Sequence, residues 1–380
     1  MKLLQYAAGL AEKRKREVIE FQIRKDNLNA KRVTESVAVP LNEGQVRVNI
    51  EKFALTANNI TYAVAGEQMG YWRFFPAIND PEGEWGVMPV WGFAVVSEST
   101  LPEIEVGERL YGYFPPATEL TLTPKRLSKT RFTEGAPYRQ DLAAAYNNYK
   151  RLGADPDYDA STDNERMLLA PLFTTSFCLW DSLADKNWCG AKQVIIVSAS
   201  SKTSIGLSYA LAADPQAPKV IGVTSQRNLA LVEKIGTYDQ GVTYDDVEAI
   251  DASIPSVIVD MSGNADVLGR LHSHLGDNML FCSNVGITHW GEVSENSNII
   301  KERSEFFFAP AHIQKRVGDW GAAAYEEKIE NFMSSAAAKS REWMHIAEVD
   351  GLTGVDNIYL DVCDGKIAAD QALIVKIAKP

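Results

Sequence analysis

Hydroxyl and ammonium groups are concentrated in one five-residue segment of this 380-residue chain. The segment consists of Ser200, Ser201, Lys202, Thr203 and Ser204. A helix beginning at this segment would add the free backbone N–H groups of its first turn, and together these groups can bind a diphosphate. The segment therefore predicts a phosphate site. The alternative is an ordinary turn whose hydroxyls only cap the helix, because the G-x-G-x-x-G spacing is missing.

The missing glycines change how such a turn would hold phosphate. A Cβ atom keeps a diphosphate farther from the backbone than glycine does, so side chains must replace part of the backbone contact. We expect the ammonium group of Lys202 and the neighbouring hydroxyls to do so. The run Ser-Lys-Thr-Ser also resembles the end of a Walker turn, G-x-x-x-x-G-K-[ST], but both glycines of that motif are absent and no Walker site is expected.

A second polar segment, residues 224–227, indicates which cofactor the first segment would serve. An Asp or Glu at this place in a nucleotide-binding fold usually binds a free ribose, but here the residues include Ser225 and Arg227. These suit the 2′-phosphate of NADPH. A bound phosphate would also remove the conflict between Arg227 and the positive end of a helix that starts nearby. The alternatives are an exposed arginine and a capping role for Ser225 or Asn228.

Alternating strands and helices must position both segments. Apolar runs predict strands at residues 194–199, 219–224, 256–261 and 278–283. Helical patterns separate these strands, at residues 205–211, 228–235 and 265–275. Short links between such elements imply right-handed crossovers and a parallel sheet, with ligands at the carboxyl ends of the strands. The second half of the chain therefore predicts a Rossmann-type, doubly wound parallel sheet of the α/β class.

The first half of the chain predicts mostly antiparallel β structure. Strand-like patterns occur at residues 18–23, 45–53, 90–97 and 109–114. Residues 138–158 turn helical in pattern, and a polar stretch at 155–165 marks a domain junction. A long apolar helix at 167–184 then leads into the first strand of the parallel sheet. A helix at 322–337 and a strand-like segment at 372–377 close the chain.

Four short segments are similar to one known superfamily. They lie at residues 55–62, 71–76, 146–149 and 199–203. Together with an irregular β domain followed by a Rossmann domain, they resemble the zinc-free, quinone-oxidoreductase-like side of the medium-chain dehydrogenase/reductase superfamily, in an uncharacterised branch of unknown function. The resemblance implies a GroES-like irregular β domain at 1–165, completed by 314–380, that holds the substrate. It also implies a Rossmann dinucleotide-binding domain at 166–313.

The resemblance further implies that no metal is bound. In zinc-dependent relatives a cysteine precedes a loop glycine by nine positions, and here Ala57 takes that place before Gly66. No Gly-His-Glu segment follows, and the first histidine of the chain is His272. His272 and His274 lie two residues apart on a predicted helix, where they would point to different faces. We therefore expect both to be solvated rather than to form a metal pair.

The same resemblance places residues 58–62 and 71–75 in a loop that faces the nicotinamide. Hydride transfer to an activated double bond or a quinone leaves an enolate-like group to be protonated. Tyr62 is the expected proton donor or, like Asn59, a hydrogen-bond donor to the carbonyl. Packing in the core is the competing explanation for the aromatic residues of this region, among them Trp72.

Charge and cysteine content exclude several classes of function. The formal net charge is −12, and the only basic block is residues 13–16, so neither a nucleic acid nor an anionic membrane surface is an expected partner. The four cysteines are far apart, which suggests neither a disulfide framework nor a zinc knuckle and fits a reducing, cytoplasmic location. No segment is expected to span a membrane. The apolar stretch 3–10 is short and its basic cluster follows it, whereas in a signal peptide the charge comes first.

Two functional hypotheses follow. The first is an NADPH-dependent, zinc-independent reductase that passes hydride to a small carbonyl-containing acceptor, either a quinone or an α,β-unsaturated carbonyl. The second is a non-catalytic protein that keeps a nucleotide or another ligand on a reductase fold. A methyltransferase is a third alternative, weakened by the β domain that precedes the parallel sheet. The expected partner is a small-molecule substrate, and a homodimer is left open.

Overall fold

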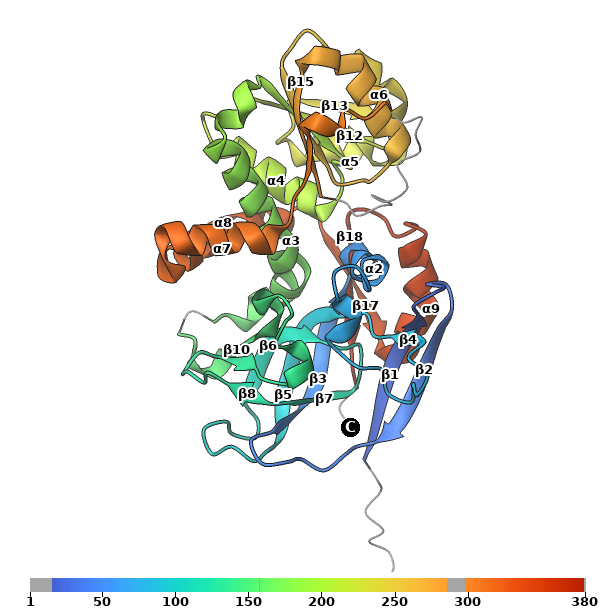
Figure 1. Cartoon of the computed structure of the whole chain (residues 1–380), viewed down its shortest axis with the longest axis vertical. Helices are drawn as coiled ribbons and strands as arrows, with labels where there is room; N and C mark the ends of the chain where they lie inside the picture. Colours follow the sequence, from blue (N-terminus) through green and yellow to red (C-terminus); the bar gives the residue numbers. More distant parts are fainter. Residues whose placement is uncertain (1–15, 157, 286–297, 379–380) are drawn as a thin grey trace, which may run out of the picture.

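The computed structural model describes residues 16–156, 158–285 and 298–378. Two bodies are stacked along the long axis of the molecule, and helix α3 (Asp163–Asp185) packs against elements of both (Figure 1). The lower body contains two β-sheets, and the upper body contains one parallel sheet with helices around it. This confirms the predicted fold class, an irregular β domain together with a Rossmann-type domain.

The upper sheet has six parallel strands in the order β13-β12-β11-β14-β15-β16. Their bounds are β11 (Gln193–Val197), β12 (Lys219–Thr224), β13 (Gln240–Thr243), β14 (Ser256–Asp260), β15 (Met279–Asn284) and β16 (Ser304–Phe306). β11 and β14 are buried over their whole length, as expected for parallel strands covered on both faces. β13 and β16 were not predicted, because strands this short leave no apolar run in the sequence.

Helices return the chain from one parallel strand to the next. They are α4 (Lys202–Ala212), α5 (Leu229–Ile235) and α6 (Ala265–Leu275). The side chain of Ser201 caps α4 by accepting a hydrogen bond from the amide of Ser204. α5 ends at Gly236, whose φ of 72° lies in the left-handed region that glycine tolerates. The cap at Ser201 places the N-terminus of α4 close to the carboxyl end of β11.

The lower body contains a nine-stranded sheet and a three-stranded sheet. The larger has the order β17-β18-β3-β5-β6-β10-β9-β8, with β7 beside β3, and the smaller has the order β2-β1-β4. The bounds of the N-terminal strands are β1 (Glu17–Arg24), β2 (Lys31–Val37), β3 (Val46–Leu55), β4 (Trp85–Gly86), β5 (Val90–Ser99), β6 (Arg109–Phe114), β7 (Glu119–Leu122), β8 (Pro124–Lys125), β9 (Arg131–Glu134) and β10 (Asn148–Arg151). The four strands predicted for this half are present as β1, β3, β5 and β6, and the other six are additional.

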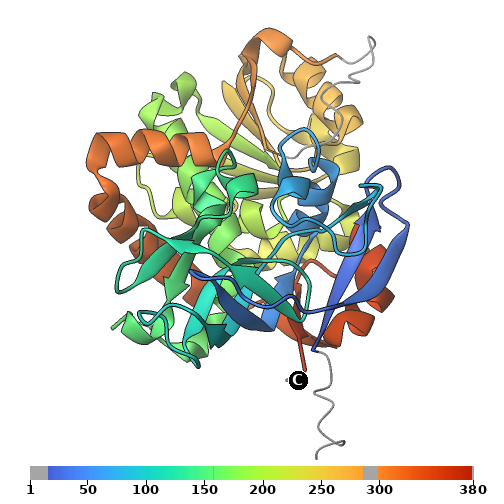
Figure 2. The same cartoon turned by 60° about the horizontal axis from the view of Figure 1, so that its bottom comes forward.

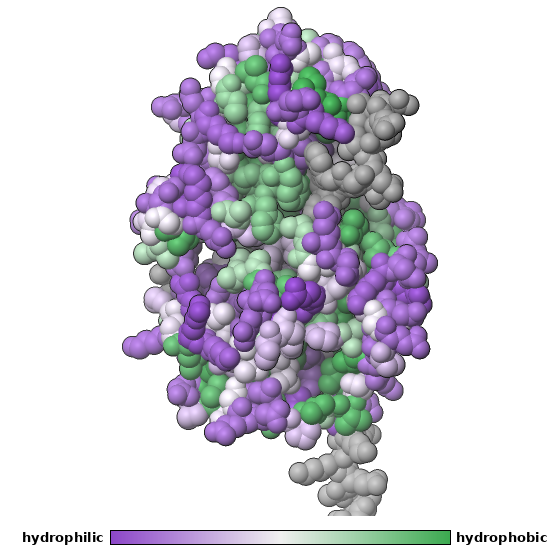
Figure 3. All heavy atoms as spheres, viewed as in Figure 1, coloured by the Kyte–Doolittle hydropathy of each residue, from purple (hydrophilic) through white to green (hydrophobic). Residues whose placement is uncertain are grey.

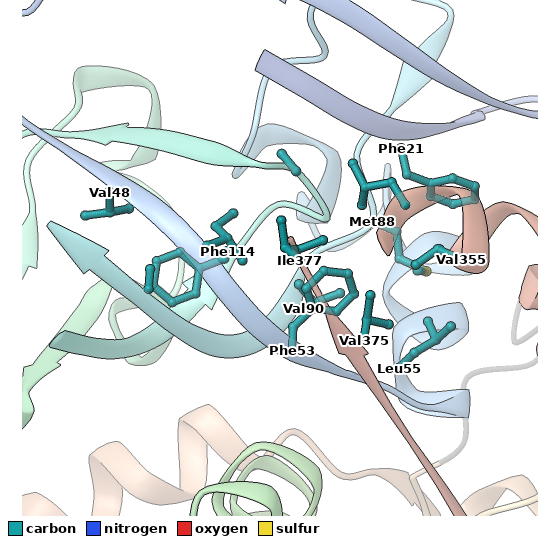
Figure 4. Packing of buried hydrophobic residues seen from close by; sticks show 14 of the residues in the cluster. Phe21, Val48, Phe53, Leu55, Met88, Val90, Phe114, Val355, Val375 and Ile377 are labelled. Carbon is teal, nitrogen blue, oxygen red and sulfur yellow. The ribbon is translucent and has the colours of Figure 1, made fainter. Parts of the chain in front are cut away.

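The end of the chain returns to the lower body. The return consists of β17 (His345–Asp350), α9 (Gly351–Cys363) and β18 (Gln371–Lys376). β18 pairs with β3, near the middle of the larger sheet. Figure 4 shows Val375 and Ile377 packed close to Phe53 and Val90 of the N-terminal strands. The core of the lower body is thus built from both ends of the sequence.

Two local predictions in the lower body are wrong. The described residues of the range 138–158 form no α-helix, because short 3₁₀ turns lead instead into β10, which pairs with β6 and β9. This pairing buries Tyr149, whose hydroxyl donates to the carbonyl of Tyr113 (2.6 Å), and so overrides the helical pattern. Residues 58–62 are not a loop but part of helix α2 (Ala57–Val64).

Helix α3 and the turn before it, residues 160–185, are long and apolar enough to cross a membrane. This corrects the expectation that no segment has that length and composition. The most apolar part of the segment is 61% buried inside the protein, as in the core helix of a folded domain. Two further helices, α7 (Ala309–Trp320) and α8 (Ala322–Ser340), pack against α3 and extend sideways from the junction of the two bodies (Figure 1).

The surface seen from the same side is mostly hydrophilic. Figure 3 shows apolar atoms gathered in a central band that runs from the upper body toward the junction.

Candidate active site

The turn after β11 forms without the glycines of the usual motif. Ser198 adopts a φ of 65°, a left-handed conformation that normally favours glycine. Ser201 then caps α4, and its hydroxyl donates to that of Ser204 (2.8 Å). The amides of Lys202 and Thr203 have no hydrogen-bond partner in the part of the chain that the structure describes. The turn therefore presents free N–H groups at the positive end of α4.

Hydroxyl groups join the ends of β11 and β12. Ser200 Oγ accepts hydrogen bonds from Thr224 Oγ1 (3.1 Å) and from the side-chain amide of Asn228 (3.0 Å). The hydroxyl of Ser225, next in sequence to Thr224, is buried without a hydrogen-bond partner. A buried unpaired hydroxyl costs free energy, so such a group indicates a position where a polar group of a ligand fits. Ser225 is the strongest sign of a ligand at this edge of the sheet.

The two cations of this edge are engaged by the other body. The ammonium group of Lys202 donates to the carbonyls of Ala369 (3.2 Å) and Gln371 (2.8 Å). The guanidinium of Arg227 donates to the carbonyl of Gly365 (2.6 Å). Burial lowers the pKa of Lys202 to about 8. The sequence predicted both residues as phosphate ligands, whereas in this structure they bind carbonyls of residues 365–371, which lead into β18.

Two other residues of the turn pack against neighbouring elements. Ser204 is buried and bonded within the cap of α4, so its hydroxyl is not open to a ligand. The carbonyl of Thr203 accepts a hydrogen bond from Ser176 Oγ of α3 (2.7 Å). Gly206, the glycine nearest the turn, lies where a Cβ atom would come within 2.5 Å of Phe173. This glycine therefore serves the close packing of α4 on α3 rather than phosphate binding.

Helix α2 carries the two residues predicted to act on the substrate, and one of them holds the helix in place. The amide of Thr56 donates to the side-chain oxygen of Asn59 (2.7 Å). The side-chain nitrogen of Asn59 donates to the carbonyl of Pro89 (2.8 Å), and the residue is 2% exposed. Asn59 therefore caps α2 and anchors it beside β5, a role different from the one predicted. Its neighbour Asn58 is half-exposed.

Tyr62 lies within a group of aromatic rings that we name the tyrosine cluster: Tyr62, Tyr71, Trp91, Tyr113 and Tyr146. The centroid of the Tyr62 ring is 4.6 Å from that of Tyr71, 5.6 Å from that of Tyr113 and 6.1 Å from that of Tyr146. The Tyr62 hydroxyl accepts a hydrogen bond from Trp91 Nε1 (3.4 Å). Tyr62 is 5% exposed, whereas Trp91 and Tyr146 are half-buried and form the open side of the cluster.

Burial keeps the phenols of the tyrosine cluster protonated. It raises the pKa of Tyr62, and it raises the pKa values of Tyr113 and Tyr146 well above the ordinary value. Each phenol therefore holds its proton at neutral pH and can donate a hydrogen bond. The hydroxyls of Tyr71 and Tyr146 pair with each other (3.1 Å), but that of Tyr113 is buried without a partner.

Sequence reasoning assigned no function to Trp91, Tyr113 or Tyr146. Trp91 and Tyr113 lie opposite each other on the paired strands β5 and β6. The short 3₁₀ turn η3 (Ala144–Asn147) brings Tyr146 beside them. These residues are far from Tyr62 in sequence, and only the strand pairing brings them to α2.

The phosphate turn and the tyrosine cluster approach each other through β18. Gln371, which accepts the hydrogen bond from Lys202, is the first residue of that strand, and Leu373 lies opposite Leu55 of β3. Helix α2 begins two residues after Leu55. Figures 1 and 2 both show α2 at the junction of the two bodies. The carboxyl edge of the parallel sheet and the helix that carries Tyr62 thus border the same junction.

The sequence decides the family of this protein. Residues 53–368 match the family described as "Protein of unknown function (DUF2855)". The chain belongs to this family. Curated proteins offer no match to the sequence. The DUF2855 protein has the fold of solved reductases and of an alcohol dehydrogenase, which is the fold that the sequence resemblance implied.

Three solved structures illustrate this likeness in fold. CurA from Vibrio vulnificus, in complex with NADPH, has a TM-score of 0.60 at 14% identity, covering 95% of this chain and 100% of that chain. A putative NADPH:quinone reductase from Bacillus thuringiensis has a TM-score of 0.54 at 11% identity, covering 95% and 99%. An alcohol dehydrogenase from Thermotoga maritima has a TM-score of 0.54 at 11% identity, covering 96% and 100%. Identities this low establish the fold alone.

Two histidines of the DUF2855 protein lie deeper than predicted. His272 was expected to be solvated, but it is fully buried, its Nδ1 accepts a hydrogen bond from the amide of Ile300 (3.0 Å), and burial lowers its pKa to about 4. His274 is half-buried and its Nε2 bonds to the carbonyl of Ile250 (2.7 Å). Within residues 16–156, 158–285 and 298–378, no three His, Cys, Asp or Glu side chains form a group that could hold a metal. All four cysteines are free.

Proposed function

We propose that this protein is a zinc-independent, NADPH-dependent reductase whose acceptor is a quinone or an α,β-unsaturated carbonyl. One observation carries the proposal: the hydrogen bond from Lys202 to Gln371 joins the carboxyl edge of a Rossmann sheet to the strand beside α2. A dinucleotide bound along that edge would reach the junction where α2 carries Tyr62. The complex of CurA with NADPH, on the same fold, supports the choice of cofactor.

The residues at the sheet edge fit the phosphates of a dinucleotide. The free amides of Lys202 and Thr203 lie at the positive end of α4, which favours a diphosphate. The unpartnered hydroxyl of Ser225 and the exposed guanidinium of Arg227 suit a 2′-phosphate, and residues 224–227 contain no Asp or Glu to repel it. NADPH supplies the hydride when it is bound.

Tyr62 is the residue best placed to assist the acceptor. Because burial keeps its hydroxyl protonated, it can hydrogen-bond the carbonyl oxygen of the acceptor and release a proton as negative charge develops there. The Trp91 N–H bonds to the Tyr62 oxygen and so restricts the direction of its O–H group. Ala57, at the start of the same helix, offers no metal ligand, so in this proposal the phenol takes the place of a Lewis acid.

Titration with NADPH and NADH, followed by assays with quinones and enones, tests the proposal. We expect NADPH to bind more tightly than NADH. We also expect at least one class of acceptor to oxidise NADPH, seen as loss of its absorbance, without added zinc. Equal affinities for the two cofactors would contradict the cofactor assignment, and turnover that requires zinc would contradict the mechanism.

A non-catalytic ligand-binding protein is the second candidate. The observation that favours it is that carbonyls of residues 365–371 already bind Lys202 and Arg227, which leaves fewer cations for phosphate. A ligand could then bind at the sheet edge without reacting. Tight binding of NADPH with no turnover on any quinone or enone would favour this candidate over the reductase.

A further inference from the structure

A cavity of about 440 Å³ opens between α3, α4 and α8. Four aromatic side chains line it: Phe177 and Trp180 of α3, Tyr209 of α4 and Phe332 of α8. Tyr209 belongs to the C-terminal half of α4, whereas the phosphate turn, residues 200–204, ends in the first turn of this helix. The cavity and the proposed cofactor edge therefore lie at opposite ends of α4. A volume of this size with a mainly apolar lining is typical of a small-molecule site.

Polar residues also line the cavity: Asp214, Asn331, Ser335 and Lys339. The carboxylate of Asp214 is already satisfied, because it accepts hydrogen bonds from Trp180 Nε1 (3.0 Å) and from the amide of Gln216 (2.9 Å). The ammonium group of Lys339, by contrast, forms no ion pair or hydrogen bond in the described ranges, although the backbone carbonyl of this residue accepts a hydrogen bond from the amide of Glu342. Its ammonium group lies 5.4 Å from the centre of the Tyr209 ring. The cavity thus combines aromatic walls with one unpaired cation.

We infer that this cavity binds an apolar molecule with one anionic end, of the class of a medium-chain carboxylic acid. The apolar chain would displace water from Phe177, Trp180 and Phe332, and the carboxylate would pair with Lys339. The chain as a whole carries a net charge of −12, which disfavours the binding of an anion. A carboxylate ligand therefore needs a local unpaired cation, such as the ammonium group of Lys339, in order to bind. The inference is independent of the proposed reductase activity.

Calorimetric titration with three ten-carbon ligands tests the charge of the ligand. Decanoate, decanol and decylamine share one apolar chain and differ only in the head group. We expect decanoate to bind most tightly, decanol about fivefold more weakly, and decylamine most weakly, as for one ion pair near the surface. Decanol binding as tightly as decanoate would overturn the anionic assignment. Failure of all three to bind, below the concentrations at which they form micelles, would overturn the site.

Two lysines of α8 give a matched pair of variants. Lys339 lines the cavity, whereas Lys328 does not, and both ammonium groups lie over aromatic rings, that of Lys328 at 5.2 Å from Trp320. Lys339→Gln should weaken decanoate binding about fivefold and leave decanol binding unchanged. Lys328→Gln should change neither. An equal loss in both variants, or no loss in Lys339→Gln, would contradict the pairing of the carboxylate with Lys339.

Filling the cavity tests its location. Ser335 is an exposed residue of α8 that lines the cavity, so an indole introduced there can occupy the space without disturbing the core. Ser335→Trp should abolish decanoate binding while the thermal midpoint of unfolding stays unchanged. Undiminished decanoate binding by the folded Ser335→Trp variant would overturn the location.

Discussion

The ammonium group of Lys202 donates a hydrogen bond of 2.8 Å to the backbone carbonyl of Gln371. The two residues open α4 and β18, which belong to different bodies of the molecule. The carbonyls of Gln371 and Ala369 already accept hydrogen bonds from this ammonium group. The phosphates of a dinucleotide would therefore have to bind mainly to the free amides of α4 and to Ser225. The contact therefore positions the proposed site and also limits how it can bind phosphate.

Arg227→Ala should discriminate between the two nicotinamide cofactors. Only NADPH carries a 2′-phosphate, so the variant should lose roughly 1.5–3 kcal/mol of binding free energy for NADPH and almost none for NADH. Calorimetric titration of both cofactors measures this difference. Lys234→Ala, at an exposed position of the same helix region, is the control and should alter neither affinity. Equal losses for NADPH and NADH in Arg227→Ala would show that the residue acts only through its bond to Gly365.

Tyr62→Phe should separate catalysis from cofactor binding. The ring and its packing remain while the proton donor is lost, so we expect NADPH affinity to be kept and the rate to fall by about 10²-fold or more. The assay requires an accepted quinone or enone, with cofactor binding measured on the same preparation. Full activity in the variant would remove Tyr62 from the mechanism and leave it as a packing residue.

Tyr113→Phe and Tyr149→Phe should change stability in opposite directions. The Tyr113 hydroxyl is buried without a partner, so its removal should raise the free energy of unfolding by about 1 kcal/mol. The Tyr149 hydroxyl donates to the Tyr113 carbonyl (2.6 Å), so its removal should lower that free energy by about 1 kcal/mol. Urea unfolding of the two variants measures both changes. Destabilisation by Tyr113→Phe would mean that its hydroxyl has a partner in solution.

Asn59→Ala should destabilise the lower body by about 2 kcal/mol. The variant loses the acceptor for the Thr56 amide and the donor to the Pro89 carbonyl, so both buried backbone groups are left unpaired. Asn58→Ala changes a half-exposed side chain on the same turn and should cost much less. Similar unfolding midpoints for the two variants would contradict the anchoring role of Asn59.

Glu20 should make stability depend on pH. Burial raises its pKa in the folded protein to about 7, from the ordinary value of 4.5, so the folded state binds more protons between these two pH values. The neutral carboxyl makes its full contribution to the free energy of unfolding below pH 4.5, and this contribution is lost as the pH rises through 7. Glu20→Gln keeps an oxygen to accept from Gln22 (2.6 Å) and from the amide of Ile78 (3.1 Å).

This variant should therefore be more stable than the wild type at pH 8, by roughly 2–3 kcal/mol, and equally stable at pH 4. Urea unfolding at several pH values provides the comparison. Glu17→Gln, at an exposed position on the same strand, should leave the pH dependence unchanged. If the free energy of unfolding of the wild type rose between pH 5 and 7, and that of Glu20→Gln did not, the predicted sign would be reversed.

Much of the upper body was predictable from the sequence because its signals are local. Buried parallel strands leave short apolar runs, as at residues 194–197 and 256–260, and the helix caps lie within three residues of the groups that they satisfy. The lower body was predicted less completely. Its helix α2 is short, and the pattern of residues 138–158 yields to the pairing of β10 with strands far away in sequence.

The sequence by itself determined the alternation of strands and helices, the polar turn after the first Rossmann strand, and the absence of a cysteine at Ala57. These properties depend on residue type and on spacing within a few turns of the chain. Only the tertiary structure decided that Lys202 binds the carbonyl at the start of β18, that Asn59 anchors α2, and that Trp91 and Tyr113 lie against Tyr62. Each of these partners is at least 29 residues away along the chain. No local pattern encodes such a pairing, because packing of the two bodies and pairing of the strands select it.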